Sequence, residues 1–197
     1  ATIIRFRKNL GKSAALSAGF MRSNGDILVT VDADLQDDPD EIPSLMNKLE
    51  EGYDLVVGWR KKRNDQKGKI QLSRIFNSTV SWAMGVSLHD MNCGLKVMRR
   101  SVGEEIDLYG ELHRYIPVLA AARGFRVGEV EVVHHERKFG HSKFGSERIM
   151  RAGLDLITTV FLTSYKSRPL HIFGLLGFVM SLLGLFPLLY LTYLHFI

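Results

Sequence analysis

Residues 29–39 read VTVDADLQDDP, and this stretch decides the fold and the chemistry that we expect. The β-branched and apolar residues 27–31 predict a buried strand, which then breaks into an acidic turn. Oxygen-bearing side chains alternate in that turn, at Asp32, Asp34 and Gln36. In an open α/β sheet, ligands bind at the carboxyl ends of the strands. Two carboxylates and an amide there suit Mg²⁺ or Mn²⁺, with coordination positions left for phosphate oxygens.

Spacing alone also allows a second interpretation, in which these side chains belong to a solvated acidic turn. An EF-hand calcium loop is excluded, because its sixth position is Asp37 rather than Gly and its twelfth is Pro43 rather than Glu. Features elsewhere in the sequence are therefore needed to distinguish a cation site from a solvated turn.

The last 26 residues, Ile172–Ile197, contain no Asp, Glu, Lys or Arg. As a helix they would measure about 39 Å, against a bilayer hydrocarbon core of about 30 Å. This length predicts a transmembrane helix, tilted or kinked at Pro187, with Tyr190 and Tyr193 suited to the far interface. A buried core helix of this length is the weaker alternative.

All 26 basic and 21 acidic residues fall before that segment, so the net charge of +5 belongs to the preceding part of the chain. Positive charge there suits an anionic membrane face or a phosphorylated substrate. Lys166 and Arg168 directly precede the apolar segment, and the positive-inside rule therefore places the preceding domain in the cytoplasm. The single Cys93 is at odds with a disulfide framework and fits a reducing compartment.

Strand and helix patterns alternate along the first part of the chain. We predict strands at Thr2–Phe6 and Tyr53–Val57, and helices at Gly11–Arg22 and Asp40–Glu51, the second capped by Asp40. This alternation predicts an α/β fold with a mostly parallel sheet. The Gly-Lys-Ser start of the first helix is half of a phosphate-binding P-loop, which disfavours an NTPase and leaves a phosphate near this helix end open.

The second part of the chain continues the pattern. We predict helices at 74–84 and Gly110–Ala122, and a strand at Phe125–Val133. Residues 146–165 carry an apolar stripe at helical spacing, which predicts an amphipathic helix on the membrane surface; packing of that stripe against the domain is the alternative.

Two basic clusters accompany these elements. Residues 60–74 hold seven Lys and Arg against one acid, and residues 134–145 interleave basic side chains with Gly and aromatics. Arg74 and Ser78 lie four residues apart, on one face of a helix. Each cluster is either a solvated loop or an anion site facing the membrane. Zinc at the paired histidines of the second cluster is rejected, since no third ligand has suitable spacing, and a bilayer tether disfavours nucleic acid.

Together these features predict one chemistry. A metal at a strand end would hold the diphosphate of a nucleotide-sugar, and cationic side chains would hold a lipid phosphate beside the bilayer. That phosphate is already ionised at neutral pH, so it needs orientation and charge compensation more than a general base. A single displacement at the anomeric carbon would invert its configuration. Glycosidase action is disfavoured, because carboxylates bound to a metal cannot serve as acid and nucleophile.

The motifs DADLQDDP, GWRKKRND, HDMNCGLK, LYGELHRYIP and HHERKFGHSKFG occur in this order before a membrane segment. In this the chain resembles the polyprenyl-phosphate glycosyltransferases of glycosyltransferase family 2, such as dolichol-phosphate mannosyltransferases and bacterial polyprenyl-phosphate glucosyltransferases. The resemblance implies a GT-A-type, Rossmann-like sheet and a hexosyltransferase that uses a UDP-glucose or GDP-mannose class of donor. The family's Pro-x-Tyr-Asn-Glu turn and Asp-Asp-Gly-Ser segment are absent here, so we expect the chain to begin inside a domain.

The resemblance also implies roles for individual residues. The divalent metal, Mg²⁺ or Mn²⁺, and through it the donor, would be held by Asp32, Asp34 and Gln36. Asp90 borders the active site, as a base or a positioning residue. The acceptor phosphate would be held by Arg60, Arg74, Ser78, Arg137 and Lys143, the last two on a loop that closes over the phosphates.

Three parts of the chain follow from this interpretation: a cytoplasmic glycosyltransferase domain at 1–145, an amphipathic interfacial helix and linker at 146–170, and a transmembrane helix at 171–197. The expected partners are a nucleotide-sugar, a polyprenyl or dolichyl phosphate and the lipid bilayer, without nucleic acid and with a homo-oligomer left open. One rival is a processive polysaccharide synthase, although Gln71-Leu72-Ser73-Arg74-Ile75 lacks the Trp of its Gln-x-x-Arg-Trp motif. The other is a non-catalytic membrane module, as an inactive fragment or an anionic-lipid anchor.

Overall fold

The computed structural model describes residues 2–61, 88–135, 158 and 170–196. The chain divides into two compact units, residues 1–159 and 160–197, which we treat separately. The predicted helices at 74–84 and 146–165 lie outside the described residues, apart from Thr158.

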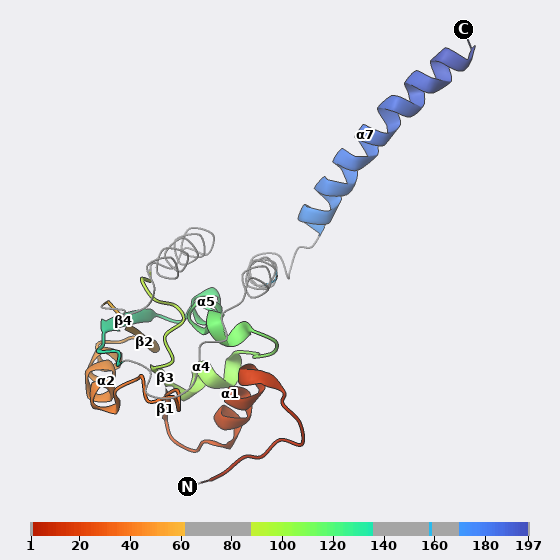
Figure 1. The fold of residues 1–197 in the computed structure, drawn as a ribbon. Helices are drawn as coiled ribbons and strands as arrows, with labels where there is room; N and C mark the ends of the chain where they lie inside the picture. The colour runs from red at the N-terminus through yellow and green to blue at the C-terminus, as the bar shows by residue number, and fades with distance from the viewer. Residues whose placement is uncertain (1, 62–87, 136–157, 159–169, 197) are drawn as a thin grey trace. The chain divides into compact units, whose positions relative to one another are not determined.

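The first unit is built on a four-stranded mixed sheet (Figure 1). Its strands β1 (Ile27–Thr30), β2 (Leu55–Trp59), β3 (Lys96–Arg99) and β4 (Val127–Glu131) lie in the order β1-β3-β2-β4. β3 pairs antiparallel with both β1 and β2, whereas β2 and β4 pair in parallel. β1, β2 and β4 therefore run in one direction, which confirms the α/β class, while β3 lies unexpectedly between the first two.

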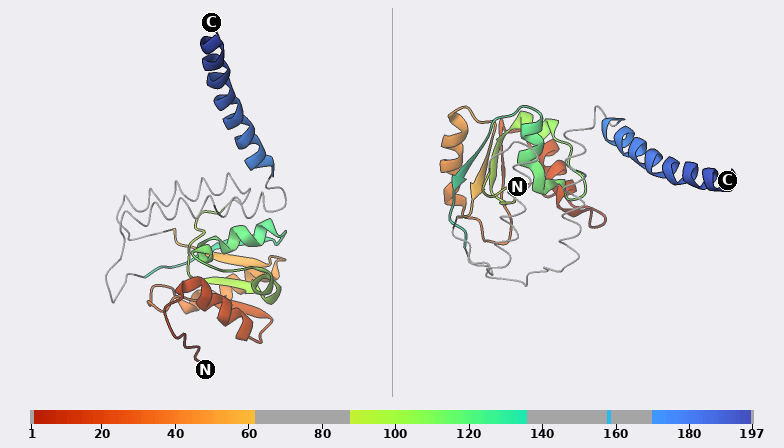
Figure 2. Two further views of the ribbon diagram at one scale, coloured as in Figure 1. Left: turned by 90° about the vertical axis from the view of Figure 1, so that its right-hand side faces the viewer. Right: turned by 90° about the horizontal axis from the view of Figure 1, so that it is seen from above.

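Helices cover both faces of the sheet. The view from above in Figure 2 shows α2 (Ile42–Glu50) on one face, and α1 (Gly11–Arg22), α4 (Arg100–Glu105) and α5 (Ile116–Ala122) on the other. Two short 3₁₀ turns, η1 (Pro39–Glu41) and η2 (Leu112–Tyr115), lead into α2 and α5. The layers bury Leu45 and Leu49 of α2, Val56 and Val97 of the sheet and Tyr115 of η2 at 1% exposure or less, each worth about 1.5–3 kcal/mol of apolar burial.

The acidic turn and α2 are joined by a cap two residues earlier than expected. The Asp38 carboxylate accepts a hydrogen bond from the Asp40 backbone N–H at 3.0 Å, and the chain enters η1 at Pro39. The predicted cap, Asp40, instead lies inside η1. Gly52, at φ 98°, ends the helix in the left-handed region that favours glycine.

Other sequence predictions differ from the structure in extent. Residues 2–6 form no strand, and Ile3 is 90% exposed. A strand needs a partner for its backbone groups, and none of the four described strands pairs with this segment. The predicted helix at Gly110–Ala122 is divided into η2 and α5, and the strand at Phe125–Val133 shortens to β4.

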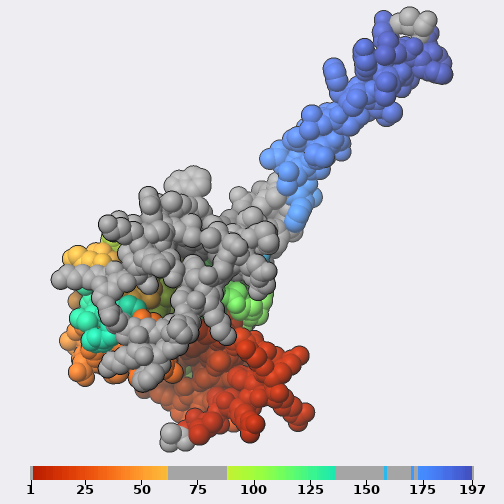
Figure 3. All heavy atoms as spheres, in the orientation of Figure 1, coloured from red at the N-terminus to blue at the C-terminus, as the bar shows by residue number. Residues whose placement is uncertain are grey.

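The second unit contains α7 (Leu170–Phe196), a helix of 27 residues that includes Pro187. The span Phe173–Phe196, part of the helix drawn in Figure 3, contains an 18-residue window with a mean hydropathy of 2.1, and no residue of that window is buried. By length and composition this helix can cross a membrane. It is the described counterpart of the transmembrane helix that the sequence predicts.

Candidate functional site

Three loops meet at one edge of the sheet. β1 and β2 end there in residues 31–38 and 60–61, and antiparallel β3 begins there, so that the preceding loop 88–95 lies between them. The Thr30 hydroxyl donates to the Gly94 carbonyl at 2.8 Å, and the Gly58 N–H donates to the Leu95 carbonyl at 3.0 Å. The edge therefore carries the acidic loop (residues 31–38) and the loop that contains Asp90 side by side.

The three predicted metal ligands have different partners. Lys12, at the start of α1, contacts the Asp32 carboxylate at 2.5 Å, with both side chains about 40% exposed. The Asp34 carboxylate accepts from the Gln36 N–H at 3.4 Å, and the Gln36 amide donates to the His135 carbonyl at 3.2 Å. The loop turns at Leu35, whose φ of 60° is unusual for a side chain with a Cβ.

A third acidic residue, Asp37, lies beside Asp32 and accepts from the Asp32 N–H at 3.4 Å. A Cβ placed on Gly94 would be 2.6 Å from both Asp32 Cγ and Asp37 Oδ2, so only glycine leaves room for the two carboxylates. Burial raises the pKa of Asp37, but His134, the Asp32 amide and the Arg60 charge together bring it below its usual value. The alternating pattern missed Asp37, because the turn at Leu35 shifts which side chains face the site.

The acidic loop has the donor chemistry of a divalent-cation site. Asp32 is partly exposed and already holds one cation, the Lys12 ammonium. Among the described residues, no three His, Cys, Asp or Glu side chains come together as a metal site. The carboxylate and amide side chains of the loop are of the type that a hard cation prefers, and their joint binding of a metal stays a prediction.

Arg60 and Asp90 form the Arg60–Asp90 clamp. The guanidinium donates through Nε at 2.7 Å and Nη2 at 3.1 Å, one bond to each carboxylate oxygen, with 17% of the Arg60 side chain and 1% of the Asp90 side chain exposed. Burial alone would lower the pKa of Arg60, but Asp90 raises it above its usual value. Both Asp90 oxygens face a permanently charged group, which suits positioning better than proton transfer.

Lys96 lies beneath this edge, at the start of β3. It is 5% exposed, and its ammonium contacts the Cys93 carbonyl. Burial lowers its pKa to about 8, and the charges of Lys12, Asp32 and Asp90 also act on it. The sequence predictions gave Lys96 no role, because its burial depends on the position of β3 between β1 and β2.

His113 is a second residue that sequence reasoning left unassigned. Its Nδ1 lies 3.1 Å from the Ser13 hydroxyl, which also accepts from the His113 N–H at 3.0 Å. Burial lowers the pKa of His113 to about 4, with a smaller lowering from the nearby Lys12. The LYGELHRYIP motif is thus attached to the start of α1, beside the Lys12–Asp32 contact.

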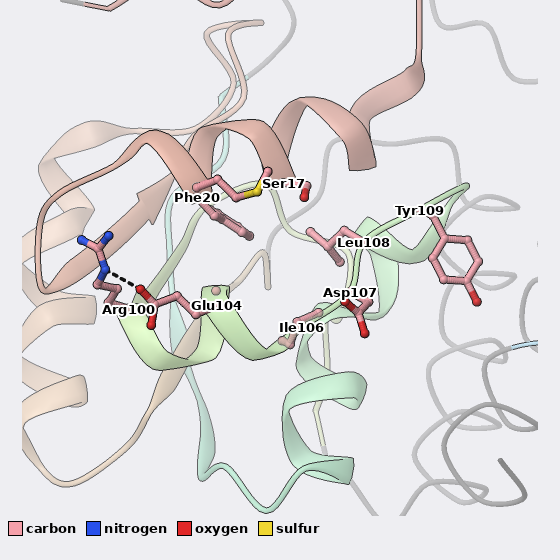
Figure 4. A pocket seen from close by; sticks show the side chains of 10 residues that line it. Ser17, Phe20, Arg100, Glu104, Ile106, Asp107, Leu108 and Tyr109 are labelled. Carbon is pink, nitrogen blue, oxygen red and sulfur yellow. Dashed lines mark hydrogen bonds and ion pairs between the residues drawn. The ribbon is translucent and has the colours of Figure 1, made fainter. Parts of the chain in front are cut away.

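The remaining predicted site residues are not among the described ones. Arg74, Ser78, Arg137 and Lys143 fall in ranges outside the described residues, so their proposed contact with an acceptor phosphate stays a prediction. Away from the site, a pocket of about 620 Å³ lies between α1 and α4 (Figure 4). It is lined by none of the predicted site residues.

Comparison with known proteins identifies the family of the chain. The family model of glycosyl transferase family 2 matches residues 1–107. The chain belongs to glycosyl transferase family 2.

Its curated relatives act on polyprenyl phosphates according to their names. The dodecaprenyl-phosphate galacturonate synthase of Rhizobium johnstonii is 41% identical, over 99% of this chain and 59% of that protein. The undecaprenyl-phosphate 4-deoxy-4-formamido-L-arabinose transferase of Pseudomonas aeruginosa is 37% identical, over 95% of this chain and 54% of that protein. The chain thus spans between half and two thirds of the length of these relatives.

The fold is that of solved glycosyltransferase structures. Glucosyl-3-phosphoglycerate synthase from Mycobacterium tuberculosis, in complex with Mn²⁺ and UDP-glucose, has a TM-score of 0.58 at 19% identity, over 81% of this chain and 56% of that one. Its complex with phosphoglyceric acid gives the same values. This likeness confirms the predicted GT-A-type fold.

Proposed function

We propose that the protein transfers a sugar from a nucleotide-sugar to a polyprenyl phosphate at the cytoplasmic face of a membrane. One observation carries the proposal: the acidic loop and the Arg60–Asp90 clamp lie at the same sheet edge, so that Arg60 lowers the pKa of Asp37. A site with both signs of charge can hold a cation-bound diphosphate and an anionic acceptor together. The names of the curated relatives support the acceptor class.

The acidic loop is the donor side of this site. Asp32, Asp34 and Gln36 would hold Mg²⁺ or Mn²⁺, which when bound supplies charge to the departing nucleoside diphosphate. The Mn²⁺ and UDP-glucose in the mycobacterial synthase support a divalent metal and a nucleotide-sugar. Lys12 would leave Asp32 when the metal arrives, and its ammonium is then available to the diphosphate.

Arg60 forms the acceptor side, with Arg74, Ser78, Arg137 and Lys143 as further proposed contacts. An oxygen of the lipid phosphate forms a bond to the anomeric carbon as the bond to the diphosphate breaks, which inverts the configuration. The phosphate oxygen carries no proton that must be removed at neutral pH. Asp90 therefore holds Arg60 in place and takes no proton.

The helix α7 would anchor this site to the bilayer. Its 24-residue apolar stretch matches the hydrocarbon core of about 30 Å. Lys166 and Arg168, before the helix, support the cytoplasmic side for the catalytic domain.

A donor screen on the complete protein in lipid vesicles tests the function. The donors are UDP-glucose, GDP-mannose, a UDP-hexuronate and a UDP-linked formamido-pentose, the last two chosen from the names of the relatives. The acceptor is a short polyprenyl phosphate, and the readout is a lipid-linked sugar that requires a divalent metal. Asp34→Ala should abolish the product.

The same assay separates the rival functions. A product that lengthens with time, without a lipid-phosphate acceptor, would favour a processive polysaccharide synthase. Binding of the lipid phosphate without product, at any metal concentration and with every donor, would favour a non-catalytic membrane module. Either result overturns the proposal.

A further inference from the structure

The contact between the end of β2 and loop 88–95 has two consecutive parts. The Trp59 indole stacks on the His89 imidazole, with ring centroids 4.2 Å apart and planes 17° apart. The next residue of each segment, Arg60 and Asp90, forms the clamp. Because consecutive residues pair with consecutive residues, the ring stack sets the register with which Asp90 meets Arg60.

Glu129 of β4 holds His89 from a second strand. One carboxylate oxygen accepts a hydrogen bond from the His89 N–H at 2.8 Å, and the other contacts the ring at Nδ1. Glu129 is paired with Val57 across the parallel β2–β4 ladder, and 16% of its side chain is exposed. Backbone and ring of His89 are therefore both attached to the sheet, one residue before Asp90.

The clamp leaves part of the Arg60 guanidinium for a ligand. Asp90 takes the Nε hydrogen and one Nη2 hydrogen, and the planar guanidinium then directs its remaining Nη1 and Nη2 hydrogens along fixed lines. A rotation or shift of Asp90 would turn the guanidinium and change the direction of the hydrogens that remain for a ligand. The position of Asp90 thus determines where Arg60 can meet an oxyanion.

We propose that Glu129, His89 and Trp59 are positioning residues for the acceptor phosphate, acting through Asp90 on Arg60. This inference rests on the proposed function, in which Arg60 meets the lipid phosphate. It assigns to the middle of β4 and to the Trp of GWRKKRND a role in acceptor binding.

Glu129→Ala in the complete protein tests the inference. We expect the KM for a short polyprenyl phosphate to rise about tenfold, while the donor KM changes by less than about twofold. Glu129→Gln should recover most of the acceptor KM, since its amide oxygen still accepts from the His89 N–H. Glu104→Ala is the control: Glu104 lies on α4 and pairs with Arg100 at 2.7 Å.

Three outcomes would overturn the inference: an equal rise in both KM values, a Glu104→Ala effect as large as that of Glu129→Ala, or no change. If Glu129→Ala does not fold, Trp59→Leu removes the ring stack instead, with the same split expected between acceptor and donor.

A binding arm distinguishes failure of the inference from failure of the proposed function. The Kd of the short polyprenyl phosphate is measured without donor, so that it does not depend on turnover. If the Kd rises about tenfold in Glu129→Ala, the positioning role is supported, even when the wild-type protein forms no lipid-linked sugar. The absence of product from the wild type would overturn the transferase proposal alone. Normal turnover with an unchanged Kd and KM in the variant overturns the positioning role alone.

Discussion

The acidic loop and the Arg60–Asp90 clamp lie at one edge of the sheet, yet they hold their charges differently. In the acidic loop, the Lys12–Asp32 pair has both side chains about 40% exposed. In the clamp, Arg60 and Asp90 are joined by two bonds and Asp90 is 1% exposed. Exposed pairs are worth about 0–1 kcal/mol, whereas breaking a buried pair costs about 3–5 kcal/mol. One part of the site can exchange partners and the other cannot.

This difference suits the two proposed substrates. A donor that arrives with a metal and leaves as a diphosphate needs carboxylates that can release one cation and take another. An acceptor phosphate needs a charge whose direction is already set, because most of the rate comes from positioning and electrostatics. Four substitutions test the contrast between an exchangeable and a fixed half.

The largest expected effect is on the fixed half. Asp90→Ala leaves the Arg60 guanidinium buried without its bidentate partner, and should lower the free energy of unfolding by about 3–5 kcal/mol. Chemical unfolding of the detergent-solubilised protein, followed by tryptophan fluorescence, measures this loss. The double variant Arg60→Met with Asp90→Leu should lose less, since no charge stays buried alone. A loss below about 1 kcal/mol in Asp90→Ala would mean that the clamp behaves like an exposed pair.

Lys96 lies between the two halves and should make stability depend on pH. Its folded pKa of about 8 is below the usual 10.5, so its charged form is disfavoured by folding. Below pH 8 Lys96 is protonated in both the folded and the unfolded state, and burying its charge lowers the stability of the fold by about 3 kcal/mol. This destabilisation decreases as the pH rises from 8 to about 10.5, because the folded state loses the proton at a lower pH than the unfolded state.

Lys96→Met should therefore be more stable than the wild type at pH 7, and this advantage should shrink between pH 8 and 10.5. Burial raises the pKa of Cys93, and the charges of Cys93 and Lys96 act on each other, so both proteins are compared in a Cys93→Ser background. An advantage that stays constant with pH would contradict a buried, titrating Lys96.

Gly94 lies where the two halves touch. Gly94→Ala places a Cβ 2.6 Å from Asp32 Cγ and from Asp37 Oδ2, so at least one carboxylate must move. We expect metal-dependent turnover to fall about tenfold, because the proposed ligand Asp32 is displaced. Gly19→Ala is the control, since a Cβ there meets nothing within 4 Å and helix α1 gains propensity. Equal turnover in both variants would show that Asp32 does not need its observed position.

Much of this arrangement was visible in the sequence. The strand before Asp32, the helices α1 and α2 and the apolar stretch of α7 follow from periodicity and turn residues, and the motif order identified the family. Register is different, because it depends on contacts between distant residues. Strand-helix-strand alternation alone predicts a mostly parallel sheet. It did not predict that β3 lies antiparallel between β1 and β2, or that Lys96 is buried as a result.

The contacts within the site likewise could not be predicted from local sequence patterns. Arg60 and Asp90 were named from motifs, but their pairing joins positions 30 residues apart in the chain. The Trp59–His89 stack and the Glu129 contacts have no local signal either, since each joins residues that are far apart in the chain. Asp37 was missed for a local reason, the left-handed turn at Leu35, which a pattern of alternating side chains does not contain.

The smallest expected effect is on the exchangeable half. Lys12→Met removes an exposed ion pair, and the free energy of unfolding should change by less than about 1 kcal/mol. If the Lys12 ammonium competes with the metal for Asp32, its removal should also lower the Mn²⁺ concentration that half-saturates binding to the complete protein. Titration with Mn²⁺ in the absence of donor measures this, with Lys48→Met as the control, because Lys48 pairs with Glu51 on α2 instead. A stability loss as large as that of Asp90→Ala would show that both halves are equally fixed, and the proposed division of the site would then be wrong.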